Sequence, residues 1–88
     1  METTVAFTSK SLEELASEGA LPEQFSTKAI GYFHFFCQGT PEEERKAVEQ
    51  RFLLEVPEGT VLVAKFDYFK LTGDQSKYWA SGIAVVTP

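Results

Sequence analysis

The chain has 88 residues, enough for one domain and too few for two, and its apolar and charged content is close to the globular average. Its net charge of −5 disfavours non-specific attraction to nucleic-acid phosphates and to anionic membranes. The single cysteine excludes an internal disulfide, no apolar run approaches the ~20 residues of a transmembrane helix, and the start of the chain lacks signal-peptide features. We therefore expect a cytoplasmic protein.

The first part of the chain predicts a short strand followed by a short helix. Residues 3–8 are rich in β-branched and apolar residues and favour a strand. Residues 9–18 favour a helix, because Ser11 and Glu14 have the spacing of a capping box. Gly19 is expected to end this helix and to begin a connection to the next strand.

Segment 27–37 carries the clearest strand pattern, with β-branched and aromatic residues throughout. Alternation gives this strand two different faces. Odd positions supply Ala29, Gly31, Phe33, Phe35 and Cys37, and even positions supply Lys28, Ile30, Tyr32, His34 and Phe36. Because both faces carry large apolar groups, the strand is either central and covered on both sides or forms an aromatic platform on an open face.

A second helix is predicted over residues 40–52. Thr40 can cap it, and Pro41 suits the first helical position. Residues 52–56 either end this helix or begin an extended segment, and residues 57–59 form a turn.

The last third of the chain predicts an antiparallel hairpin. Residues 60–71 and 77–87 are long strand-like runs, joined by a glycine-containing loop at 72–76. The predicted fold class is thus α+β, with an antiparallel sheet of three or four strands and two helices in the order β-α-β-α-β-β. We expect it to form a single domain over residues 1–88.

Residue types for common catalytic and metal sites are scarce. His34 and Cys37 are the only imidazole and thiol, and residues three apart on a strand point to opposite faces. Two such ligands cannot make a closed zinc site, and the scattered glycines form no phosphate-binding loop. The sequence predicts no catalytic residue, no metal and no cofactor. Asp67, between two aromatic residues, is either a carboxylate with a raised pKa or, as we favour, a solvent-facing side chain.

The aromatic content gives the main functional expectation. Eight Phe, three Tyr and one Trp exceed what two helices with narrow apolar stripes can cover. We expect a non-enzymatic protein-interaction module that binds a protein partner or a second copy. The candidate binding residues are the rings that could meet on one sheet face: Tyr32, His34, Phe36, Tyr68, Tyr78 and Trp79.

Two alternatives remain open. A small ligand or substrate could bind in a pocket between the sheet and the helices, with the tyrosines, His34 and Asp67 around it. Single-stranded nucleic acid could stack on sheet aromatics beside strand lysines. The acidic balance of the whole chain makes the nucleic-acid alternative the weaker one.

Overall fold

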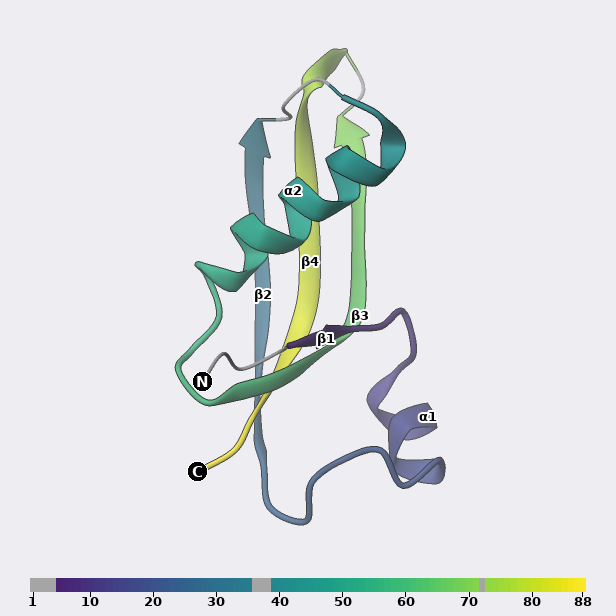
Figure 1. Ribbon diagram of the computed structural model, residues 1–88, viewed down its shortest axis with the longest axis vertical. Helices are drawn as coiled ribbons and strands as arrows, with labels where there is room; N and C mark the ends of the chain where they lie inside the picture. The colour runs from purple at the N-terminus through teal and green to yellow at the C-terminus, as the bar shows by residue number, and fades with distance from the viewer. Residues whose placement is uncertain (1–4, 36–38, 72) are drawn as a thin grey trace.

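The computed structural model describes residues 5–35, 39–71 and 73–88, and for residues 74–76 it describes only the backbone. The chain forms two helices and four strands. The strands make one sheet, and the second helix lies across one face of it (Figure 1). The elements are β1 (Ala6–Phe7), α1 (Leu12–Ser17), β2 (Ser26–Phe35), α2 (Pro41–Leu53), β3 (Thr60–Leu71) and β4 (Asp74–Val86). The predicted α+β class and the order β-α-β-α-β-β are confirmed.

The strands lie in the order β1-β3-β4-β2. β4 is central and pairs antiparallel with both β2 and β3, whereas β1 pairs parallel with β3, which makes the sheet mixed. β2 is therefore an edge strand. The interpretation of segment 27–37 as a central strand is wrong, because β2 has a neighbour on one side only.

Local chemistry explains where the helices begin and end. α1 begins after Ser11 and not at residue 9, because the Ser11 hydroxyl accepts a hydrogen bond from the Glu14 N–H at 3.2 Å. Thr40 caps α2 in the same way, accepting from the Glu43 N–H at 3.2 Å. The ambiguous segment 52–56 contains the end of α2 and a turn.

The hairpin reaches further than the sequence predicted. β4 begins at Asp74, three residues before the predicted start, so strand pairing replaces most of the expected loop. Gly73 has a φ of 89°, a left-handed conformation that glycine adopts without a steric penalty. The turn is therefore tight.

The core lies between α2 and the sheet. Val48 and Phe52 of α2 are fully buried, and the Phe52 ring packs edge-on against Phe66 with centroids 5.2 Å apart. Gly82 of β4 lies directly beneath, where an added Cβ would be only 3.1 Å from the Phe52 ring. Close approach of helix and sheet therefore depends on this glycine.

A bulge in β3 sets which side chains face α2. The register with β4 shifts between Ala64 and Asp67, and Lys65 within the shift has a φ of 52°. After the shift, Phe66 packs in the core under α2, whereas Asp67 is exposed. At the other end of the sheet, α1 lies beside β3 (Figure 1).

Candidate functional site

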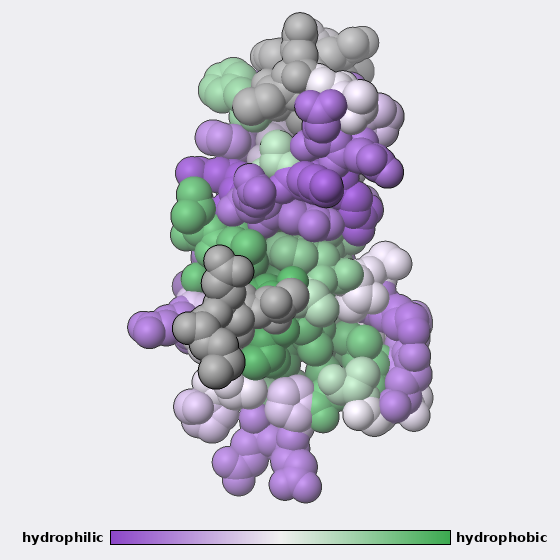
Figure 2. Space-filling view, viewed as in Figure 1, coloured by the Kyte–Doolittle hydropathy of each residue, from purple (hydrophilic) through white to green (hydrophobic). Residues whose placement is uncertain are grey.

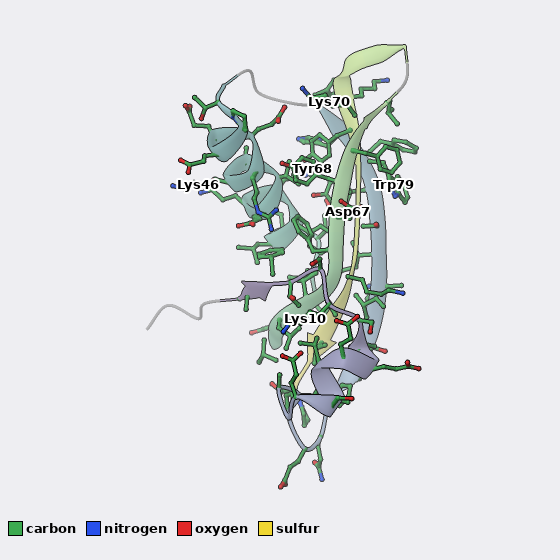
Figure 3. The ribbon with its side chains drawn as sticks, turned by 90° about the vertical axis from the view of Figure 1, so that its right-hand side faces the viewer. Lys10, Lys46, Asp67, Tyr68, Lys70 and Trp79 are labelled. Atoms are coloured by element: carbon green, nitrogen blue, oxygen red, sulfur yellow. The ribbon has the colours of Figure 1, made fainter. Side chains whose placement is uncertain are left out.

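Four aromatic side chains lie on the face of the sheet opposite α2: Phe33, Phe35, Phe69 and Trp79. We call this surface the aromatic face. Phe33 of β2, Trp79 of β4 and Phe69 of β3 are directly opposite one another across three neighbouring strands. Figure 3 shows Trp79 on the side of the sheet away from α2, and Tyr68 toward α2.

The rings of the aromatic face contact side chains beside them on the sheet. The Phe33 and Trp79 ring centroids are 4.8 Å apart, and the planes meet at 60°. The Trp79 ring also extends over Gly31, where an added Cβ would lie 2.5 Å from a ring carbon. The Lys77 ammonium nitrogen lies 5.2 Å from the Phe35 ring centroid, within range of a cation–π interaction. The arrangement is a row of rings across three strands, in which Phe33 and Trp79 are in contact.

Solvent reaches this face to an unusual extent. Phe33, Phe35 and Phe69 are 62%, 59% and 55% exposed, and Trp79 is half-buried. By contrast, Figure 2 shows hydrophilic side chains gathered over α2 on the other side of the molecule. Of the two interpretations of segment 27–37, the structure shows the aromatic platform on an open face. The surplus of rings expected from composition is therefore located here.

A hollow adjoins the aromatic row. Ser81 of β4 and Asp67 of β3, which are paired and follow the aromatic row along their strands, line it together with Ala29 of β2. The hollow has a volume of about 390 Å³, and Lys65 and Asp67 both line it. Asp67 is exposed, as favoured from the sequence, and its carboxylate accepts a hydrogen bond from the Tyr68 N–H at 2.8 Å. A partner side chain could insert beside the rings.

The structure separates the six candidate residues chosen from the sequence. Tyr32, His34, Tyr68 and Tyr78 gather on the side of α2, with Tyr78 at the centre. Its ring centroid is 6.3 Å from Tyr32, 6.1 Å from His34 and 6.3 Å from Tyr68. Trp79 belongs to the aromatic face, and Phe36 lies outside the described residues, as does Cys37 of the His34–Cys37 pair. A binding role for these residues stays a prediction.

Sequence reasoning missed the most exposed rings. Alternation puts Phe33 and Phe35 on the odd face of their strand, but nothing in the sequence distinguishes that face from the even one. The missing information is the pairing register, because Phe33 meets Trp79 and Phe69 only when β4 lies between β2 and β3.

The rings under α2 pack as part of the core. Tyr78 is 2% exposed, and the Tyr32 ring packs 5.7 Å from Phe52. Burial, reinforced by the adjacent Tyr78, raises the pKa of Tyr32 well above its usual range. Tyr32 is thus neutral near pH 7. Asp67 lies on the opposite face of the sheet, so it cannot line a ligand pocket together with these tyrosines.

Two further observations concern metals and membranes. Among the described residues, no group of three or more histidine, cysteine, aspartate or glutamate side chains is placed to hold a metal ion. In the same part of the chain, neither helix has the length and apolar character needed to cross a bilayer.

Comparison with known proteins found no matching family model, no matching curated protein and no matching solved structure. The functional argument therefore depends on the geometry of the aromatic face.

Proposed function

We propose that this chain is a small, cytoplasmic, non-enzymatic protein-interaction module that binds its partner through the aromatic face. The observation that carries the proposal is the exposure of Phe33, Phe35 and Phe69 on one side of a sheet. Contiguous exposed rings of this kind are typical of protein interfaces, since burying them against a partner removes apolar surface from water. Trp79 beside them is an anchor type that dominates interface energetics.

The shape and charge of the face favour an amphipathic helix as the partner element. α2 already covers the opposite face of the same sheet with one narrow apolar stripe, and the aromatic face offers an apolar row across three strands for a second helix. Lys65 and Lys77 line the hollows beside the rings, and Asp67 is the acidic residue that lines the larger one. In a chain of net charge −5, this is a comparatively basic area. It complements a helix whose apolar stripe has acidic flanks.

The test is a selection from displayed 14-residue helices that have randomised apolar stripes and Glu, Gln or Lys at the flanking positions. We expect the recovered peptides to be enriched in Glu and to shift the emission of Trp79, the only tryptophan in the chain. Because an interface ring often contributes about 2 kcal/mol, equivalent to ~30-fold in affinity, Phe33→Ser combined with Phe69→Ser should weaken binding by about 700-fold if the two losses add.

Leu54→Ser is the matched control, because Leu54 is 73% exposed at the end of α2 and is not part of the aromatic face. It should leave the affinity within about twofold of the original. The proposal fails if no peptide is recovered, or if the recovered peptides bind the double variant as well as the original.

Single-stranded nucleic acid is the second candidate, and the stacked exposed rings beside Lys77 are the observation that favours it. The net charge of −5 opposes it, because phosphate binding needs an excess of cations. Titration with an oligothymidylate at low salt separates the two candidates. Quenching of Trp79 there, reversed by added salt, would favour nucleic acid over the helical partner.

A further inference from the structure

The outer edge of β2 presents backbone groups that the proposed function does not use, although Phe33 and Phe35 of the aromatic face project from the same strand. β2 is ten residues long, and all ten pair with β4 without a register shift. Its other side has no strand neighbour among the described residues. Such an edge presents a regular row of unpaired backbone N–H and C=O groups, which is a template for one more strand.

The other open edge of the sheet is protected, and β2 is not. On β3, beyond the two residues that pair with β1, a bulge at Lys65 interrupts the edge, and the Asp67 carboxylate occupies the Tyr68 N–H. β2 has no bulge, no proline and one charged residue, Lys28. Natural proteins that keep an edge free usually carry such protection, so its absence indicates that the β2 edge is covered.

We propose that a second copy of this chain covers it, with the two β2 strands pairing antiparallel about a twofold axis into one eight-stranded sheet. Directly opposite residues of an antiparallel pair point to the same face of the sheet. Odd-numbered residues of one copy must therefore pair with odd-numbered residues of the other, and even-numbered with even-numbered. Axes through Ile30 and through Gly31 each allow nine residues of one copy to pair with nine of the other, and the axis through Gly31, which pairs residues 27–35, is favoured by the side chains it brings together.

This register matches large side chains with small ones. Phe33 of each copy meets Ala29 of the other, Phe35 meets Thr27, and the two Gly31 residues meet at the axis. The two Lys28 residues are then six positions apart, about 20 Å, which is beyond the screening length at physiological salt. On the side of Phe33 and Phe35 the strand is thus complementary to itself in size, and the pairing keeps the two Lys28 charges apart.

The length of the edge also suits a dimer. The ten residues of β2 extend about 33 Å, so the register above pairs nine residues of each copy.

Sedimentation equilibrium over a concentration series tests the dimer. The original chain should show twice its monomer mass of 9.8 kDa. Ala29→Lys places a charge opposite Phe33 of the partner and should raise the dissociation constant at least ~10-fold. Ala16→Lys, on exposed α1, is the matched control and should remain a dimer. Backbone amide exchange should slow with concentration for alternate residues between 27 and 35.

Phe69→Ser distinguishes this inference from the proposed function, because Phe69 belongs to the aromatic face and lies two strands away from the β2 edge. The edge dimer should persist in this variant even if peptide binding is lost. A dimer that survives Ala29→Lys but dissociates in Phe69→Ser would overturn the edge pairing and indicate face-to-face association. A monomer at every concentration would also overturn it.

Discussion

Replacing Phe52 with alanine is expected to lower the free energy of unfolding by about 3–5 kcal/mol, most of the stability of a typical small domain. Phe52 is fully buried at the centre of the core, and its ring meets three others. Their centroids are 6.0 Å away for Phe7, 5.7 Å for Tyr32 and 5.2 Å for Phe66. Removal of the ring leaves a cavity that these neighbours cannot fill without losing their own contacts. Urea unfolding followed by circular dichroism measures the loss.

The matched control is Phe69→Ala, the same chemical change on the aromatic face. Phe69 is 55% exposed, so its removal should cost less than about 1 kcal/mol. The contrast between the two variants tests which side of the sheet is the core. Equal losses would mean that the aromatic face is covered within a single molecule and is closed to a partner.

Gly82→Ala is expected to destabilise the protein by about 1–3 kcal/mol, because the new methyl group overpacks the core. It would lie 2.6 Å from a Val63 methyl and 3.1 Å from the Phe52 ring. Both side chains are fully buried, so relief requires α2 to move away from the sheet. Thermal unfolding measures the effect as a lowered Tm.

Gly31→Ala provides the comparison for this second prediction. The added methyl group would meet the Trp79 ring at 2.5 Å, but Trp79 is half-buried, so a shift of this one side chain relieves the clash without moving α2. We expect a smaller loss of stability and a change in tryptophan emission. A larger loss for Gly31→Ala than for Gly82→Ala would contradict the assignment of the two faces.

Local patterns in the sequence were sufficient to predict the elements of this fold. The caps at Ser11 and Thr40 and the hairpin centred near Gly73 are decided by neighbouring residues, and the structure contains all three features. The first and last residues of the elements were less predictable. β4 begins at Asp74 because pairing with β3 outweighs the loop-forming character of residues 74–76.

The arrangement of the sheet could not be read from local patterns. The parallel pairing of β1, the central place of β4 and the bulge at Lys65 all depend on contacts between distant segments. The candidate site shows the consequence. A surplus of rings was predictable from composition. Predicting that Phe33 and not Tyr32 is exposed required knowing that α2 covers the Tyr32 side of β2.

Hydroxyl-radical footprinting of the protein, free and with a selected helix bound, tests the central claim most directly. In the free protein, Phe33, Phe35 and Phe69 should be oxidised much faster than Phe52 and Phe66. Bound peptide should protect the first group and leave the second unchanged. Slow oxidation of all five rings in the free monomer, or protection that falls elsewhere on the molecule, would contradict a binding role for the aromatic face.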